Sequence, residues 1–242
     1  MSQVAASASD TANTPETSLA SRIVNVFFAP AKAYAAVAAR PRVLGVLAVC
    51  LVVMMAAQFA FLSTEVGKTA AFNQQIDTMK AFGINVTDEM IQRIESQMAY
   101  APITGSLSLL FFVPIVGAAV AGLLLAIFTV ISGGGATFKQ VFAVVMHSYL
   151  IGALQLLFTL PIAYAREELV SPSRLSVFFP TLDDTGFFYH LLSTIDLFHI
   201  WSVINLSIGM AVLYKRRTGG AAFVLFSIYA LIVLIIAIVR TV

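Results

Sequence analysis

Charged residues are scarce in this chain of 242 residues: they make up only 11% of it, whereas apolar residues make up 60%. A typical soluble domain has about 25% charged and about 45–50% apolar residues. So little polar surface cannot keep the chain dissolved in water, and part of its solvent has to be lipid. This excludes a soluble enzyme. The formal net charge of +2 is also too small to predict binding to nucleic acid.

Cysteine and histidine are nearly absent as well. The single cysteine, Cys50, excludes an internal disulfide framework and a cysteine-based zinc site. The three histidines are not spaced as metal ligands, so we expect no metal site. The glycine run at residues 133–135 lacks the lysine of a phosphate-binding loop and is better explained as a turn between helices. We find no Ser–His–Asp grouping and no zinc-protease signature, and therefore predict no catalytic residues, no cofactor and no enzymatic activity.

Long apolar segments dominate the rest of the chain. A helix needs about 20 apolar residues to span a bilayer, at a rise of about 1.5 Å per residue. Five segments reach that length, and Lys139 and Asp196 are their only charged residues: 43–62, 103–131, 138–164, 191–213 and 220–239. The sequence therefore predicts an all-α integral membrane protein, with a bundle of five transmembrane helices in residues 43–242.

Two short amphipathic segments precede the first predicted span. Residues 1–20 are rich in Ser, Thr and Ala and are predicted to be a disordered tail without a signal peptide. In residues 21–42, Val24 and Phe28 share one face of a short helix with other apolar residues, and Pro30 begins a second helix. Both helices are too short to cross a bilayer, so we expect them to lie in the membrane interface.

The connection between the first two spans, residues 63–102, has helical periodicity in two stretches that Gly83 separates. Thr87 is placed to cap the second helix. We therefore predict a helical hairpin on the extracytoplasmic side. The later connection, residues 166–186, contains two prolines and is predicted to be irregular.

The positions of lysine and arginine predict the orientation of the chain in the membrane. Eight basic residues lie near span ends on the side of the N-terminus: Arg22, Lys32, Arg40, Arg42, Lys139, Lys215, Arg216 and Arg217. The six on the other side are spread over longer loops and offset by acidic residues. We therefore expect the N-terminus to be cytoplasmic and the C-terminus extracytoplasmic.

Polar side chains inside the spans are the main functional candidates, because lipid offers them no hydrogen-bond partner. They are Gln58, His147, Gln155, Asp196, His199 and Asn205. Counting from the span ends places His147 and Asn205 deeper than the other four, which are predicted to share an outer layer. Two interpretations stay open. Either these residues pack helices together, with Asp196 capping the fourth span, or they form a path for protons or ions.

Two further features have a structural and a functional interpretation each. Small residues in the second span allow another helix to approach closely, either within the bundle or in a dimer: Gly117, Ala118, Ala121 and Gly122. The turn Lys215-Arg216-Arg217 either binds anionic lipid headgroups, at about 1 kcal/mol per charge, or is an ordinary cytoplasmic turn.

Two segments resemble those of a known family. Residues 132–142 have a glycine turn followed by the helix start Thr137-Phe138-Lys139, and residues 196–201, Asp-Leu-Phe-His-Ile-Trp, are similar to a family motif at the entry to the fourth span. With Phe28-Ala29-Pro30 and Tyr34 ahead of the first span, the chain resembles the Yip (Ypt-interacting protein) domain family over residues 20–240. It is most similar to the bacterial branch, which implies the bacterial inner membrane.

The resemblance implies contacts with other proteins. Eukaryotic members of the family act in membrane traffic and bind Rab-type GTPases and one another, but this chain lacks their Asp-Leu-Tyr-Gly-Pro type motif. We therefore predict a non-enzymatic membrane scaffold or adaptor that acts through membrane lipids, other membrane proteins or self-association. The alternative is a transporter or channel component that uses Gln155, Asp196 and His199, and a third class is an intramembrane enzyme.

Overall fold

The computed structural model describes residues 18–241, and these are almost entirely helical. They form ten α-helices and one 3-10 helix, with a single isolated β-bridge between Arg174 and Asp196. Most of the predicted tail at residues 1–20 lies outside the described residues. Its last two residues belong to α1 (Leu19–Phe28), because the Ser18 side chain accepts a hydrogen bond from the Ser21 backbone N–H and caps the helix.

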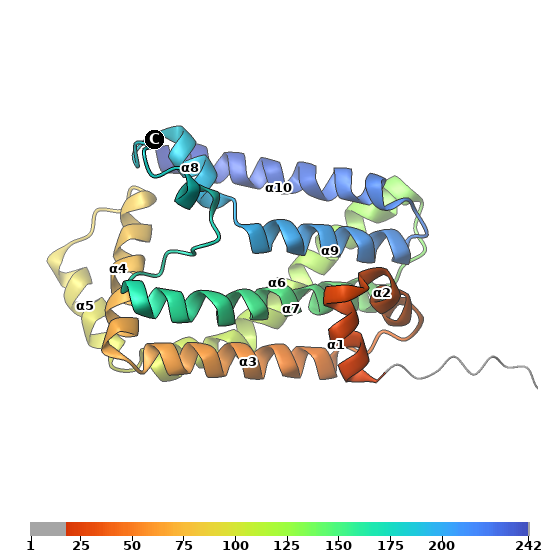
Figure 1. Cartoon of the computed structure of the whole chain (residues 1–242), viewed down its shortest axis with the longest axis horizontal. Helices are drawn as coiled ribbons and strands as arrows, with labels where there is room; N and C mark the ends of the chain where they lie inside the picture. Colours follow the sequence, from red (N-terminus) through yellow and green to blue (C-terminus); the bar gives the residue numbers. More distant parts are fainter. Residues whose placement is uncertain (1–17, 242) are drawn as a thin grey trace, which may run out of the picture.

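Five long helices form the body of the molecule. They are α3 (Leu44–Leu62), α6 (Ala101–Ser132), α7 (Phe138–Arg166), α9 (Leu197–Leu213) and α10 (Thr218–Thr241). Four of them run along the long axis, and α6 crosses the others obliquely (Figure 1). α7 is the central helix. Within its apolar 18-residue stretch, 56% is buried, compared with 17–22% in the corresponding stretches of α3, α6 and α10. α7 packs against α3, α6 and α9.

Four of the five predicted spans are long apolar helices in the structure, and the remaining one is shorter than predicted. Among the described residues, α3, α6, α7 and α10 are long and apolar enough to cross a membrane, whereas α9 has only 17 residues. The predicted span at residues 191–213 is interrupted, since α8 (Phe187–Thr194) ends before the extended residues Ile195 and Asp196. Apolar composition alone did not reveal this break. Asp196 begins a new helix there because its carboxylate accepts a hydrogen bond from the Phe198 backbone N–H at 2.8 Å.

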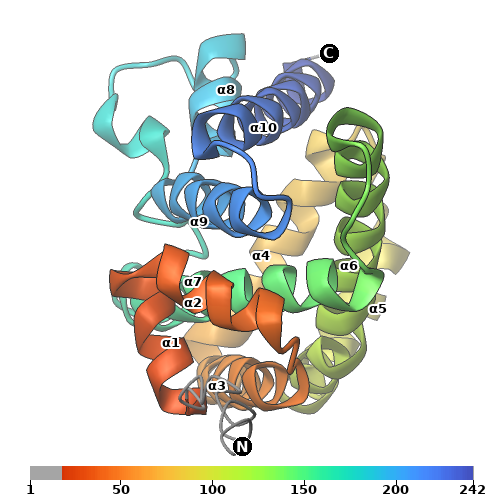
Figure 2. The same ribbon diagram turned by 90° about the vertical axis from the view of Figure 1, so that its right-hand side faces the viewer.

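One end of the bundle carries α1 and α2 (Pro30–Ala39), which we call the cap helices. They lie across the ends of the long helices, against α7 and α9 (Figure 2). The same end, the cap end, holds the α6–α7 turn and the α9–α10 turn, which are joined by a hydrogen bond from Arg216 Nη2 to the Ser132 carbonyl at 3.0 Å. The cap end thus brings together segments from the beginning, middle and end of the chain.

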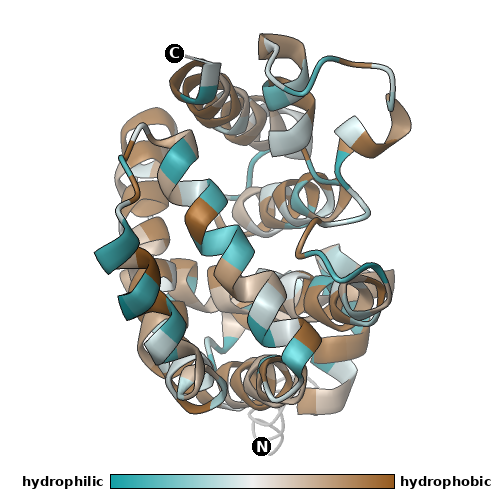
Figure 3. Ribbon diagram, turned by 90° about the vertical axis from the view of Figure 1, so that its left-hand side faces the viewer, coloured by the Kyte–Doolittle hydropathy of each residue, from teal (hydrophilic) through white to brown (hydrophobic). Residues whose placement is uncertain are grey.

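The opposite end, the far end, is built differently. α4 (Glu65–Ala81) and α5 (Asp88–Met98) lie there, and hydrophilic segments gather on them (Figure 3). Thr87 accepts a hydrogen bond from the Met90 backbone N–H at 3.4 Å, which confirms the predicted cap of α5. Gly83 lies between the two helices with φ +72°, a left-handed conformation that favours glycine. The short 3-10 helix η1 (Leu175–Phe178) and α8 complete this end.

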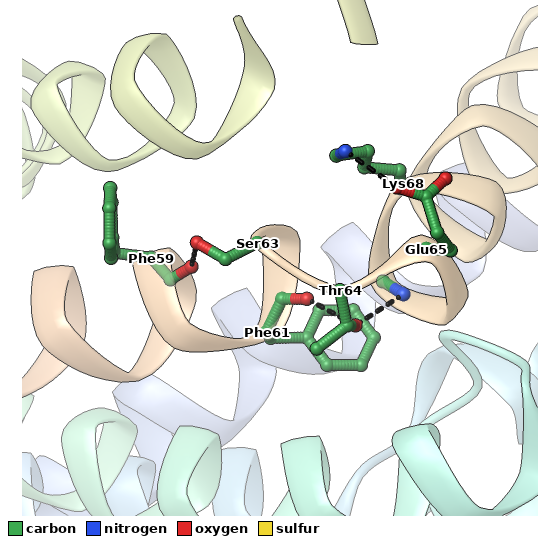
Figure 4. Close-up of polar contacts among 7 residues, drawn as sticks. Phe59, Phe61, Ser63, Thr64, Glu65 and Lys68 are labelled. Carbon is green, nitrogen blue, oxygen red and sulfur yellow. Dashed lines mark hydrogen bonds and ion pairs between the residues drawn. The ribbon is translucent and has the colours of Figure 1, made fainter. Parts of the chain in front are cut away.

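A tight corner connects α3 to α4 (Figure 4). The Thr64 hydroxyl donates to the Phe61 carbonyl at 2.7 Å and accepts a hydrogen bond from the Gly67 backbone N–H at 2.9 Å. A Cβ atom at Gly67 would lie 1.9 Å from the Phe61 carbonyl oxygen. Since that neighbour is backbone, only glycine fits, and the corner directs α4 away from the axis of α3.

The small residues of α6 do not all face the same way. Gly117 and Ala121 are buried, and a Cβ atom at Gly117 would lie 2.0 Å from Met146 Cε of α7. Ala118 and Gly122 are only half-buried, and a Cβ atom at Gly122 would meet nothing within 4 Å. The close approach therefore occurs within the bundle, between α6 and α7, on the side of Gly117.

These two glycines form a matched pair for mutation. We expect Gly117→Leu to lower the free energy of unfolding by about 1–3 kcal/mol, the usual cost of overpacking a close-packed site. Gly122→Leu should leave stability unchanged. The single tryptophan, Trp201, provides the fluorescence signal for thermal unfolding in detergent micelles. An equal loss of stability in both variants would contradict a close approach on the Gly117 side alone and would indicate a second helix packed against Gly122.

Candidate functional site

A single amide on α9 holds both cap helices against the bundle. The side chain of Asn205 is 1% exposed, and its Nδ2 donates to the Val26 carbonyl of α1 at 2.8 Å. Its Oδ1 accepts a hydrogen bond from the hydroxyl of Tyr34 of α2, which is fully buried. Because a buried polar group without a partner is costly, this arrangement fixes the position of α1 and α2 together. We call these three residues the Asn205 clamp.

The helices around the Asn205 clamp are shaped to receive it. Gly209 lies one turn after Asn205, and a Cβ atom there would meet the Tyr34 ring at 3.1 Å and Val144 Cγ1 at 2.5 Å. Glycine therefore leaves room for the tyrosine ring. A second link joins α2 to α7, since Gln140 Nε2 donates to the Ala38 carbonyl at 3.0 Å. The Gln140 side chain also closes the capping box of α7 with Thr137.

His147 and Arg22 are buried beneath the cap helices. His147 is fully buried, with Nδ1 2.7 Å from the Ala143 carbonyl oxygen, and its Nε2 has no hydrogen-bond partner among residues 18–241. Arg22 of α1 is also buried, and its charge acts on the His147 imidazole. The sequence predicted a deep polar layer of His147 and Asn205. The structure buries both residues in the cap half, but it gives them different hydrogen-bond partners.

The outer surface of the cap helices is apolar and basic. Val24 and Phe28 face away from the bundle, and Phe28 is 84% exposed. Arg22 lies on the buried face of α1. Of the apolar side predicted for this helix, Val24 and Phe28 are exposed, whereas Ile23 and Phe27 are half-buried and pack against the core. Exposed basic side chains surround it: Lys32, Arg40, Arg42, Lys139, Lys215, Arg216 and Arg217. The segments that form this end, residues 18–44, 132–140 and 213–220, contain no acidic residue.

Asp196 organises a second polar cluster, toward the far end of α9. Its Oδ2 accepts hydrogen bonds from the hydroxyls of Ser171 at 2.6 Å and Ser173 at 2.8 Å. The backbone pairs alongside, with Leu197 N–H donating to the Ser173 carbonyl at 3.1 Å. Burial and the charge of Arg240 lower the pKa of the adjacent Arg174 guanidinium, whereas the Asp196 carboxylate raises it. Asp196 therefore docks the loop before α8 onto the start of α9.

The predicted outer layer of polar residues is divided among three places. Gln58 donates to the Gly105 carbonyl at 3.3 Å and so links α3 to α6. Asp196 is in the serine cluster just described. Gln155 and His199 both line one cavity, which is bounded by α6, α7 and α9. No group of three His, Cys, Asp or Glu residues able to hold a metal occurs within the described part of the chain.

Sequence reasoning missed the partners of these polar residues. Tyr34 was noted only as part of the segment before the first span, although Ala33, Tyr34 and Val37 form the buried face of α2. That helical spacing was the available signal. Ser171 and Ser173 lie in an irregular loop, where no periodic pattern distinguishes them.

Two buried tyrosines allow a direct test of the Asn205 clamp. We expect Tyr34→Phe to destabilise the protein by about 1–3 kcal/mol, since it leaves Asn205 Oδ1 buried without its donor. Tyr214→Phe is the matched control, because the Tyr214 hydroxyl is buried without a hydrogen-bond partner in residues 18–241. Hydrogen–deuterium exchange should show faster exchange in α1 and α2 for Tyr34→Phe only. Unchanged exchange in the cap helices would refute the clamp.

Comparison with known proteins gives one match. The family model described as Yip1 domain matches residues 24–240, which cover the second half of α1, all of α2 to α9 and nearly all of α10. No curated protein and no solved structure matches the chain. The matched region contains the Asn205 clamp, the Asp196 cluster and the glycine turn before α7. The chain belongs to the Yip1 domain family of membrane proteins.

Proposed function

We propose that this protein is a non-enzymatic membrane scaffold or adaptor, which presents its cap end to lipids and to other membrane proteins. The observation that carries the proposal is the Asn205 clamp. In this clamp, the buried side chains of Asn205 and Tyr34 form hydrogen bonds that hold two short helices, and the outer face of these helices is exposed. That outer face combines Val24 and Phe28 with basic side chains, the composition of a helix that lies in a membrane interface.

The distribution of charge supports a cytoplasmic cap end and therefore a cytoplasmic N-terminus. Eight basic residues and no acidic one belong to the cap end, whereas the remaining described segments hold ten acidic and six basic residues. Basic residues near span ends favour the cytoplasmic side. The Lys215-Arg216-Arg217 turn adds a contact for anionic headgroups. We place the protein in the bacterial inner membrane, with α4 and α5 as an extracytoplasmic hairpin.

We count α9 as the fifth span. Its 17 residues extend over about 25 Å at about 1.5 Å per residue, close to the hydrocarbon thickness of about 30 Å. Asp196 then lies near the headgroup region, where its cluster is less costly than at the bilayer centre. Five spans place the C-terminus on the extracytoplasmic side.

A transporter or channel component is the second candidate, and the break between α8 and α9 is what favours it. Interrupted helices whose N-termini point at polar groups form the substrate sites of many transporters. Here the interruption lies at Asp196, and Gln155 and His199 line the neighbouring cavity. The Asp196 carboxylate already accepts hydrogen bonds from two serine hydroxyls, which favours a structural role for this residue.

The orientation is tested by labelling introduced cysteines with a membrane-impermeant thiol reagent in intact cells. We expect Thr218→Cys, at the cap end, to be protected and Asn73→Cys and Thr181→Cys, at the far end, to react. All three positions are exposed, and the native Cys50 is buried. Permeabilised cells are the control, in which all three should react. Labelling of Thr218→Cys alone in intact cells would show that the chain has the opposite orientation.

The adaptor role is tested with a photo-crosslinking amino acid at Phe28 in native membranes. We expect a discrete cross-link to another membrane protein or to a second copy, because this side chain is 84% exposed on the cap end. Ile115, near the middle of α6, is 65% exposed on a helix long enough to span the membrane, and there the reagent should reach lipid only. If Phe28 gave no protein adduct while the purified protein alone moved a solute across liposomes, the transporter would replace the adaptor.

A further inference from the structure

A groove opens between α6 and α9, with α7 as its floor. The cavity has a volume of about 340 Å³. Its floor extends from Val145 to Gln155, which is about 15 Å of helix at about 1.5 Å per residue. The walls are Leu109 to Val120 of α6 and His199 to Leu206 of α9. All three helices belong to the membrane-embedded bundle, so lipid is the solvent at its opening.

The lining of the groove is polar at one end and apolar at the other. α6 and α9 run from the far end toward the cap end, and α7 runs the opposite way (Figure 1). Gln155 of α7 and His199 of α9 therefore both lie toward the far-end side of the groove, with Ser202 one turn further along α9. Val120, Val145 and Leu206 line the other end, and Ser148 and Tyr149 of α7 lie between these residues and Gln155. This is the pattern of a site for an amphiphile, with its polar part toward the membrane surface.

His199 strengthens this argument. Its side chain is exposed near the start of α9, and it lines the same cavity as Gln155 of α7. A polar group that faces lipid is costly unless a polar partner reaches it. The Asp196 carboxylate interacts with His199 electrostatically but is itself buried under Ser171 and Ser173. A lipid headgroup at this end of the groove would supply the imidazole with a polar partner.

We propose that this groove binds one acyl chain of a glycerophospholipid from the surrounding bilayer, with the ester and phosphate groups of the lipid at Gln155 and His199. The groove is continuous with the lipid-facing surface, since Phe112 both lines it and is 63% exposed. Its volume lies at the lower end of the range of about 300–1,000 Å³ typical of ligand sites. Spread over about 15 Å, that volume is too narrow for an α-helix of a partner, which needs about 10 Å across.

This site is separate from the proposed adaptor role. The groove contains none of the exposed cap residues, and lipid binding here requires neither a protein partner nor a particular orientation of the chain. Failure of the cross-linking experiment at Phe28 would leave it intact. Conversely, an empty groove would not affect the Asn205 clamp.

The test uses the full-length protein in liposomes that contain a glycerophospholipid with a photoactivatable group on one acyl chain. After illumination, peptide mass spectrometry locates the adducts. We expect them to concentrate on the lining residues of α6, α7 and α9, well above the level on the outward residues of α10, such as Phe223 and Ile235.

Two glycines provide the variant and its control. Gly152 lies on the floor of the groove, and a Cβ atom there would meet nothing within 4 Å, so Gly152→Leu fills the groove without a clash. Gly122→Leu adds the same side chain in open space on α6, where it does not line the groove. We expect Gly152→Leu to reduce groove adducts to the level found on α10 and Gly122→Leu to have no effect. Ser202→Leu serves as a second groove-filling variant if Gly152→Leu fails to fold.

The polar end of the groove, at Gln155 and His199, is tested by a separate double substitution. His199→Leu and Gln155→Leu together should lower groove adducts of the glycerophospholipid but not those of a photoactivatable hydrocarbon without a headgroup. Adducts spread evenly over the lipid-facing surface, or unchanged by both groove-filling variants, would overturn the proposal. So would a solute flux through the purified protein that Gly152→Leu blocks, because the groove would then be a solute path.

Discussion

Polar groups surrounded by lipid must find their partners inside the protein, and the Asn205 amide is where this constraint most strongly organises the chain. Its oxygen and nitrogen join α9 to α2 and α1, which lie far from it in sequence. Lipid supplies no hydrophobic driving force between embedded helices, so such bonds and close packing determine which helices meet. Without the amide, α1 would lose its hydrogen bond to α9, and α2 would keep its link to α7 through Gln140.

Asp196 satisfies the same constraint in a different way. A carboxylate at the start of a helix can accept backbone N–H groups, and here it also accepts two serine hydroxyls from the preceding loop. This arrangement requires an interruption of the helix between α8 and α9. The extended backbone of the interruption is itself paired, through Leu175 and Leu197, so little of it is left for lipid to contact. Both segments that resemble the family, at residues 132–142 and 196–201, thus begin helices with a side-chain cap.

The parts of the fold that depend on local sequence could be predicted, and the parts that depend on distant pairs could not. Long apolar runs gave α3, α6, α7 and α10, and Thr87 gave the start of α5. The break before α9 was missed because Ile195 and Asp196 interrupt an otherwise apolar run by only two residues. Tyr34 and Asn205 are 171 positions apart, so no periodicity relates them. The sequence identified polar residues within the apolar segments, but their partners required the three-dimensional arrangement.

The fixed position of α9 also explains why one wall of the groove is rigid. Hydrogen bonds hold the helix at Asp196 and at Asn205, and aromatic rings support it between them. Phe198 contacts Phe158 of α7 with ring centroids 5.5 Å apart, and Trp201 contacts Phe27 of α1 at 5.8 Å. His199, Ser202 and Leu206 lie on another face of the same helix and line the groove. A wall that is already ordered loses little conformational entropy when a ligand binds, so even a weak, largely apolar ligand can be retained there.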